Sequence, residues 1–92
     1  MLDDPQAAFA EAQRGIAVNP GYPQIYIAGA SAAQRLGALA QARDWVATLR
    51  SRTAFNSLAA VRQRMGRAYG PASLDQFERL IDDLRDAGLP AE

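Results

Sequence analysis

Residues 19–26, NPGYPQIY, decide how the rest of this 92-residue chain is interpreted. The stretch holds two prolines and one glycine and lies between two alanine-rich segments. Proline lacks the backbone N–H that continues a helix, and glycine adopts conformations that other residues avoid, so such a stretch interrupts regular structure. It is either a linker between unrelated parts or a turn in a repeating design, and the spacing of the other interruptions distinguishes the two.

Interruptions recur along the chain at an almost constant interval. They fall near residues 20, 37, 54 and 71, one every 17 residues, which makes a unit of two segments every 34. Between them, apolar residues recur at helical spacing, and no segment alternates polar and apolar residues as a strand does. Short connections make neighbouring helices antiparallel. The sequence therefore predicts an all-α domain, a stack of about five antiparallel helices with a 34-residue period, in which residues 19–26 form a turn.

The first and last helices have the clearest end signals. Asp4 and Pro5 suit the N-cap and the first turn of a helix. The last helix is predicted to begin with a capping box at Ser73 and to end at Gly88, where a left-handed residue lets Leu89 contact the final turn. Its apolar stripe consists of Leu74, Phe77, Leu80, Ile81 and Leu84.

Composition excludes several kinds of chemistry. The chain has no cysteine and no histidine, so it cannot form disulfides or thiolate metal sites and lacks the usual general base. All ten basic residues are arginine, which also removes lysine Schiff-base chemistry and a P-loop lysine. No apolar run is long enough to cross a bilayer, and the acidic start MLDDPQ does not resemble a signal peptide. We expect one cytoplasmic domain, not an enzyme, with no catalytic residues, metal or cofactor.

Charged residues are unevenly distributed, although the formal net charge is zero. Residues 47–70 contain five arginines and no acid, and residues 71–92 contain six acids. The arginines are Arg50, Arg52, Arg62, Arg64 and Arg67. Pairing of these arginines with acids of the last helix is the favoured interpretation, and contact with a protein partner comes second. Nucleic-acid binding is a third hypothesis, which the neutral charge and the lack of lysine disfavour, so no nucleic-acid partner is expected.

The acidic cluster of Asp82, Asp83 and Asp86 is predicted to be a solvated helix face rather than a metal site. Asp82 lies three residues from both Arg79 and Arg85, a spacing that favours surface ion pairs.

A helix–turn–helix unit of 34 residues with small side chains at matched positions resembles the tetratricopeptide repeat (TPR). The match covers residues 6–53, including the junction RGIAVNPGYP, and Ala54 stands where the family has proline. The matching residues are Ala8, Ala12 and Pro20 in one unit and Tyr26, Gly29, Ala30, Ala33, Ala42 and Val46 in the next. The resemblance implies a right-handed stack, a protein-interaction or scaffolding function and a core position for Tyr26. Trp45, beside its apolar stripe, is predicted either to pack against a neighbouring unit or to be partly exposed.

The resemblance also implies a partner and a groove. The inner face of each first helix lines the ligand groove in this family, which places Gln24, Ile27, Ser31, Gln34 and Arg35 in a groove for a protein or peptide. Members that clamp the terminal carboxylate of a peptide use lysine and asparagine on that face. Ile27 and Ser31 stand there in this chain, so a receptor for chaperone tails is not expected.

The remainder of the chain keeps the spacing but loses the motif. Residues 1–54 form the recognisable repeat, and residues 55–92 form a degenerate C-terminal capping unit of the same domain. Residues 74–90, LDQFERLIDDLRDAGLP, are similar to C-terminal tails of bacterial adenylate or guanylate cyclase-like proteins and of winged-helix regulators. This similarity implies the C-terminal TPR region of a larger bacterial signalling protein. The alternatives are a regulatory or dimerisation region of a nucleotide cyclase and a small helical nucleic-acid binder that uses the central arginines.

The first helix corresponds to the second helix of a repeat whose first helix is missing. Its apolar surface around Phe9 and Ile16 is therefore predicted to be open, and a second copy of the chain would cover it in a homodimer. The alternative is that Phe9 folds back onto the next two helices.

Overall fold

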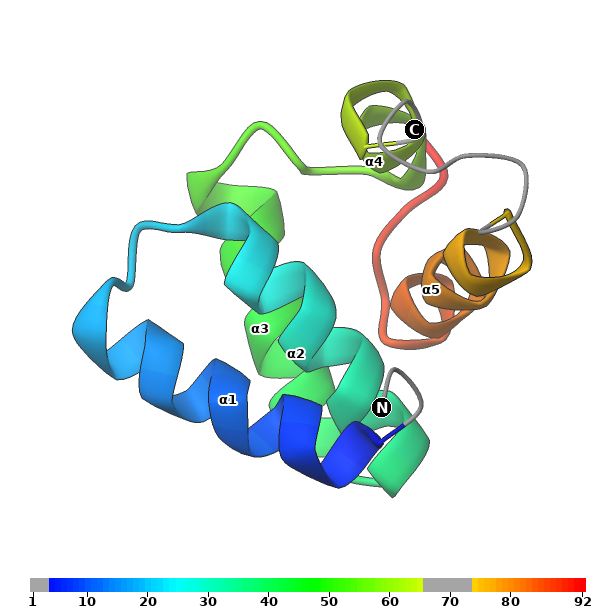
Figure 1. Ribbon diagram of the computed structural model, residues 1–92. Helices are drawn as coiled ribbons and strands as arrows, with labels where there is room; N and C mark the ends of the chain where they lie inside the picture. Colours follow the sequence, from blue (N-terminus) through cyan, green and yellow to red (C-terminus); the bar gives the residue numbers. More distant parts are fainter. Residues whose placement is uncertain (1–3, 66–73) are drawn as a thin grey trace.

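The computed structural model describes residues 4–65 and 74–92, and within them all regular secondary structure is helical, with no strand (Figure 1). The helices are α1 (Pro5–Val18), α2 (Pro23–Leu36), α3 (Leu39–Arg52), α4 (Leu58–Met65) and α5 (Leu74–Asp86). The prediction of an all-α fold with five helices is confirmed for this part of the chain. None of these helices is both long enough and apolar enough to cross a membrane.

Local sequence signals set the helix ends as predicted. The carboxylate of Asp4 accepts a hydrogen bond from the Ala7 backbone N–H at 3.1 Å, and Pro5 occupies the first turn of α1. Gly88 has a φ of 111°, and the N–H of Leu89 donates back to the carbonyl of Leu84 at 3.0 Å, which is the expected end of α5. The predicted capping residue Ser73 lies outside the described residues.

Residues 19–22 form the turn between α1 and α2, and residues 23–26 are the first turn of α2. The hydroxyl of Tyr26 donates to the carbonyl of Pro20 at 2.8 Å, and the N–H of Tyr22 donates to the carbonyl of Asn19 at 3.3 Å. Tyr26 is buried, so its ring belongs to the core while its hydroxyl fastens the turn.

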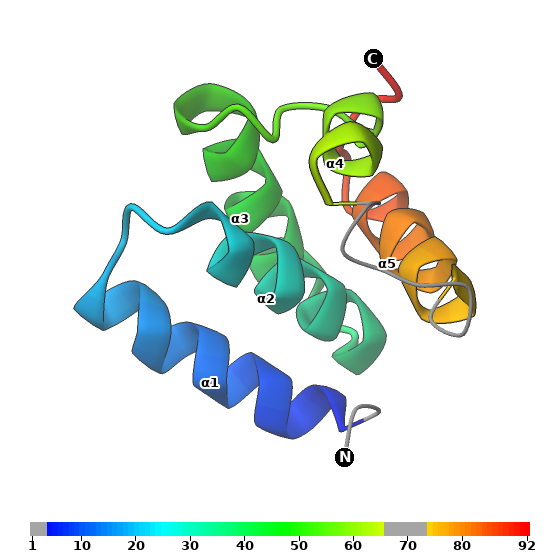
Figure 2. The ribbon, with the colours of Figure 1, turned by 45° about the horizontal axis from the view of Figure 1, so that its top comes forward.

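The central helix of the fold is α2, which packs against α1, α3 and α5 (Figures 1 and 2). Small residues make this possible. A Cβ added at Gly29 would lie 2.7 Å from the Cβ of Ala12 on α1 and 2.9 Å from the Trp45 ring on α3. Ala30 and Ala42 are fully buried.

The side chain of Trp45 is buried and packs against Phe9, so Trp45 is a core residue.

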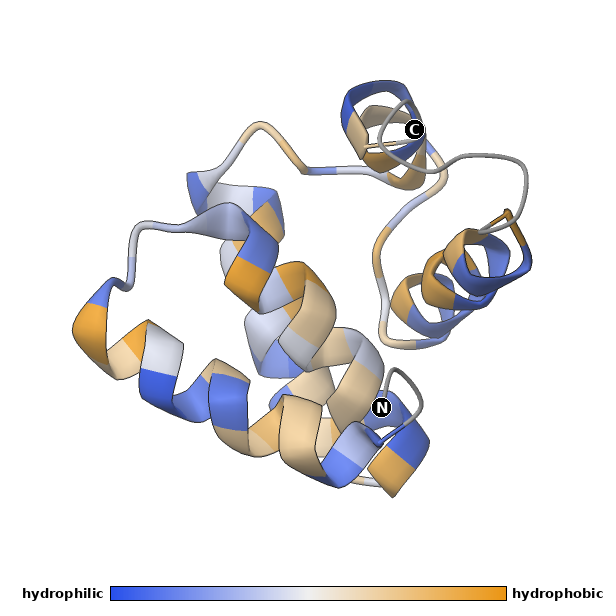
Figure 3. Ribbon diagram, in the orientation of Figure 1, coloured by the Kyte–Doolittle hydropathy of each residue, from blue (hydrophilic) through white to orange (hydrophobic). Residues whose placement is uncertain are grey.

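The C-terminal residues hold α4 and α5 together. Pro90 and Ala91 accept backbone hydrogen bonds from Leu58 and Ala59 at 2.7 and 3.0 Å, so the chain end satisfies two donors in the first turn of α4. Hydrophobic residues follow one side of α5 and hydrophilic residues the other (Figure 3). Phe77, Ile81 and Leu84 are buried, and α5 rather than α4 is the next helix to cover α2.

Candidate binding groove

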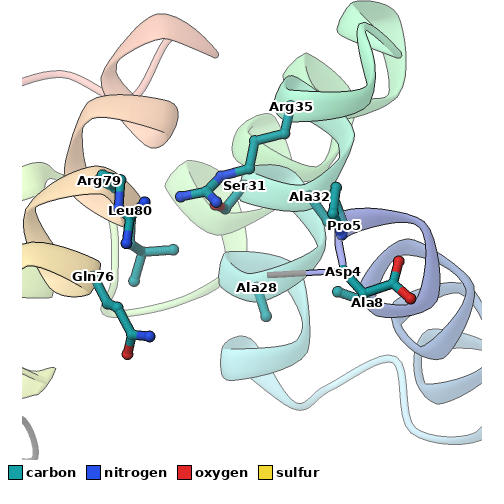
Figure 4. A pocket seen from close by; sticks show the side chains of 10 residues that line it. All are labelled: Asp4, Pro5, Ala8, Ala28, Ser31, Ala32, Arg35, Gln76, Arg79 and Leu80. Carbon is teal, nitrogen blue, oxygen red and sulfur yellow. The ribbon is translucent and has the colours of Figure 1, made fainter. Parts of the chain in front are cut away.

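A cleft of about 350 Å³ lies between the N-terminal turns of α1, residues 28–35 of α2 and the first half of α5 (Figure 4). Its floor is α2, and α1 and α5 form its walls. The lining residues are Asp4, Pro5 and Ala8 from α1 and its N-cap, Ala28, Ser31, Ala32 and Arg35 from α2, and Gln76, Arg79 and Leu80 from α5.

A second hollow of about 430 Å³ continues the cleft along α1 and α2. The two hollows share Ala8 and Ala28. The remaining lining residues of the second hollow are Glu11, Ala12, Gly15, Tyr22, Gln24 and Ile25. We call the combined depression the α1/α2 groove. Its floor on α2 runs from Ile25 to Arg35, which corresponds to about 15 Å at the helical rise of 1.5 Å per residue.

The groove exists because α1 and α2 present almost no side-chain volume where they meet. Ala8, Ala12 and Ala28 contribute only methyl groups. Gly15 contributes none, and an added Cβ there would lie 2.9 Å from Cδ1 of Ile25. Such a surface lets the backbone of another segment approach closely, and larger side chains at the ends give the groove polar edges.

The polar end of the groove is built around Asp83 of α5. Its Oδ2 accepts hydrogen bonds from the Ser31 hydroxyl at 2.6 Å and from Nε of Arg35 at 2.8 Å. The side chain of Asp83 is 17% exposed and that of Arg35 is 31% exposed, so the pair lies partly out of solvent. This contact joins α5 to α2 and holds the Arg35 guanidinium in place at the cleft.

Arg79 is the other cation of this end. It lines the cleft from α5 and is exposed, and it has no ion-pair partner among the residues that the structure describes. Asp4 lies on the α1 wall, where its carboxylate caps the helix. The groove is therefore basic on the α5 side and acidic on the α1 side.

Three of the five predicted groove residues line the hollows, and two do not. Ser31 and Arg35 line the cleft, and Gln24 lines the second hollow. Ile27 is 1% exposed and is a core residue that no partner can contact, and Gln34 lines neither hollow.

The α5 wall, formed by Gln76, Arg79 and Leu80, was not predicted from the sequence. The amphipathic pattern of α5 indicates a buried face but not the helix that buries it. No sequence signal links Arg79 to the groove.

The apolar surface predicted around Phe9 and Ile16 is partly used inside the fold. The Phe9 and Trp45 ring centroids lie 5.4 Å apart with the ring planes inclined at 47°, and both Phe9 and Ile16 are partly buried against the core. The alternative in which Phe9 folds back is the arrangement observed. A homodimer through these residues stays a prediction, with less open apolar surface available to it.

The pairing predicted for the central arginines is present at one of them. Arg62 donates to both carboxylate oxygens of Glu78 at 2.6 and 3.0 Å. These hydrogen bonds raise the pKa of Arg62 and lower the pKa of Glu78. Arg64 lies 5.9 Å from the centre of the Phe55 ring, a cation–π arrangement.

Arg50, Arg52 and Arg64 have no acidic partner in the described part of the chain, and Arg67 lies outside it. In the acidic cluster, Asp82 pairs with Arg85 and Asp83 with Arg35. Within the described ranges no group of three or more acidic side chains is arranged to hold a metal ion.

No protein-family model, curated protein or solved structure matches this chain. The helical stack fits the TPR resemblance, which stays an interpretation of the sequence motif.

Proposed function

We propose that this chain is a protein-interaction module that binds a short helical segment of a partner protein in the α1/α2 groove. In this proposal the module is a TPR-like scaffold within a larger bacterial signalling protein, and it acts by holding a partner rather than by catalysis. The observation that carries the proposal is the continuity of the two hollows over small residues of α1 and α2, mainly alanine.

The shape of the groove supports a helix as the ligand. Helix-binding grooves accept one apolar face of an amphipathic helix. The floor is about 15 Å long, the length of roughly ten helical residues. Ala8 and Ala28 line both hollows and contribute only methyl groups, so they allow the backbone of that helix to approach α1 and α2 closely. Ile25 and Leu80 supply larger apolar contacts on the two sides.

The proposal is tested by filling the groove. Ala28 is exposed and lies in both hollows, so Ala28→Trp places a large side chain across the floor without entering the core. Ala47→Trp is the matched control, because Ala47 is also an exposed alanine within a 14-residue helix but lines neither hollow. Circular dichroism checks that both variants keep the helical content of the parent.

The probe is a displayed library of helix-forming peptides of roughly 12 residues, long enough to cover the groove floor. Peptides selected on the parent chain are expected to bind Ala28→Trp at least about tenfold more weakly, a loss of about 1.4 kcal/mol, and to bind Ala47→Trp as they bind the parent. Failure to select any peptide, or equal binding to the two tryptophan variants, would reject the groove as the interaction site.

A further inference from the structure

We infer that the α5 side of the groove is a carboxylate-binding site, in which Arg35 and Arg79 together hold an acidic side chain of the bound segment. The inference rests on the proposed function for the source of that side chain, but the site itself is defined by three observations. These are the arrangement of Arg35, the presence in the same cleft of Arg79, which has no ion-pair partner among the described residues, and the distribution of acids around the cleft.

Arg35 is held in place and still has donors to offer. Asp83 accepts from Nε at 2.8 Å, and no other hydrogen bond of this guanidinium is formed within the described residues. A guanidinium carries five N–H donors in a fixed plane. The two terminal nitrogens therefore remain for a ligand, and Asp83, itself fixed by the Ser31 hydroxyl at 2.6 Å, acts as a positioning residue.

Arg79 supplies the charge that Arg35 lacks. Since Asp83 neutralises Arg35, that pair alone has no net charge with which to attract an anion. Arg79 lines the same cleft and has no ion-pair partner in the described part of the chain (Figure 4). Two arginines around one bound carboxylate allow charge-assisted hydrogen bonds from both, and Gln76, one turn before Arg79 on α5, adds a neutral amide.

Asp4, the third charged residue that lines the cleft, determines which wall the ligand carboxylate binds. Asp4 lies on the α1 wall and already accepts the Ala7 N–H. A ligand carboxylate is repelled from that wall and attracted to the α5 wall. The acidic residue of a bound helix therefore lies toward Arg79, and its apolar face lies over Ala8 and Ala28.

The experiment uses the whole chain and a small probe that does not require the partner. The probe is N-acetylglutamate amide, whose only charge is the side-chain carboxylate, and N-acetylglutamine amide is its neutral counterpart. Side-chain Nε–H signals of the arginines are followed by NMR at mildly acidic pH. We expect saturable shifts at Arg35 and Arg79, with a Kd on the order of 1–10 mM, and none with the neutral probe.

Substitutions then assign the site. Arg79→Gln removes no ion pair from the described structure and is expected to weaken probe binding about tenfold, as is Arg35→Gln. Arg43→Gln is the matched control, because Arg43 is exposed on α3 and lines neither hollow. Equal shifts at all arginines, equal shifts with the neutral probe, or stronger binding of inorganic phosphate than of the carboxylate would overturn the inference.

The two proposals fail separately. If Ala28→Trp abolishes peptide binding but N-acetylglutamate amide shifts neither arginine, the groove stands and the carboxylate site is rejected. If the probe binds at Arg35 and Arg79 but Ala28→Trp leaves peptide binding unchanged, the carboxylate site stands and the groove is rejected.

Discussion

Replacing Gly29 with alanine tests the packing on which the whole fold depends. The added methyl carbon would lie 2.7 Å from the Cβ of Ala12, 2.9 Å from Cζ3 of Trp45 and 3.0 Å from Cε3 of the same ring. Neither neighbour can move freely. The Cβ of Ala12 is fixed to the α1 backbone, and the Trp45 ring packs against Phe9 with centroids 5.4 Å apart. The three helices must therefore separate to accept one carbon atom.

Two opposing contributions set the size of the effect. Overpacking a close-packed site costs about 1–3 kcal/mol. Alanine is better than glycine in a helix interior by roughly 0.8–1 kcal/mol, which offsets part of that cost. Because both neighbours are held in place, the overpacking cost is expected in the upper part of that range, about 2–3 kcal/mol, so Gly29→Ala should lower the free energy of unfolding by about 1–2 kcal/mol. For a domain of this size that loss lowers Tm by roughly 5–15 °C.

Gly15→Ala is the matched control for this prediction. It makes the same change inside a 14-residue helix, but the added Cβ meets only Ile25, whose nearest atom is the end of a flexible and partly exposed side chain. The helix-propensity gain then dominates, so Gly15→Ala is expected to match or exceed the stability of the parent. Urea unfolding followed by circular dichroism measures both variants. The packing argument is wrong if Gly29→Ala is as stable as the parent, or if Gly15→Ala loses as much as Gly29→Ala.

Three further predictions concern the core and the charged residues. Ala42 is fully buried, so Ala42→Leu is expected to destabilise the chain by about 1–3 kcal/mol through overpacking, and an unchanged Tm would contradict the position assigned to α3. The pKa of Glu78 is lowered because Arg62 donates hydrogen bonds to its carboxylate. The pair therefore stabilises the fold at pH values above the ordinary carboxyl pKa of 4.5, and this stabilisation is lost as the pH falls through the lowered pKa. Acid unfolding of Glu78→Gln is therefore expected to depend slightly less steeply on pH in that range, and an identical acid-unfolding profile would argue against the pair. The chain is expected not to bind a random DNA duplex at physiological salt, although Arg50 and Arg52 lack acidic partners in the described structure; a Kd of about 10⁻⁴–10⁻⁶ M that weakens steeply with salt would restore the nucleic-acid hypothesis.

The sequence predicts where each helix begins and ends better than it predicts which helices pack against one another. Helix ends depend on local chemistry, such as the Asp4 cap and the left-handed Gly88, and this chemistry is visible in the residues themselves. The burial of Tyr26 follows from the repeat pattern and is also observed. Trp45 shows the limit of such a pattern, because its position beside the apolar stripe did not reveal that Phe9 on a different helix would cover it.

Three of the five predicted groove residues, Gln24, Ser31 and Arg35, line the hollows of the structure, and helix geometry explains why Ile27 does not. Ile27 and Ser31 are one turn apart and share a face, which the repeat resemblance assigns to the ligand. In this chain Ile27 is buried, and Ser31 donates to Asp83 of α5, so α5 occupies that side. Ala28 and Ala32 lie one residue further along and are rotated by about 100° around the helix axis.

The cleft between α1 and α5 is therefore lined by Ala28 and Ala32 as well as by Ser31 and Arg35 of the predicted face. In our proposal a bound segment therefore contacts α1, α2 and α5, of which α5 is distant in sequence from the other two. The apolar floor comes from α2, and α5 contributes Arg79, a cation with no ion-pair partner in the described part of the chain. Since α5 forms both the wall and the Asp83 contact that positions Arg35, the C-terminal residues do more than cap the stack. In our proposal they complete the binding site, and a chain that ends after α3 would retain the alanine floor but lose Arg79 and the residue that positions Arg35.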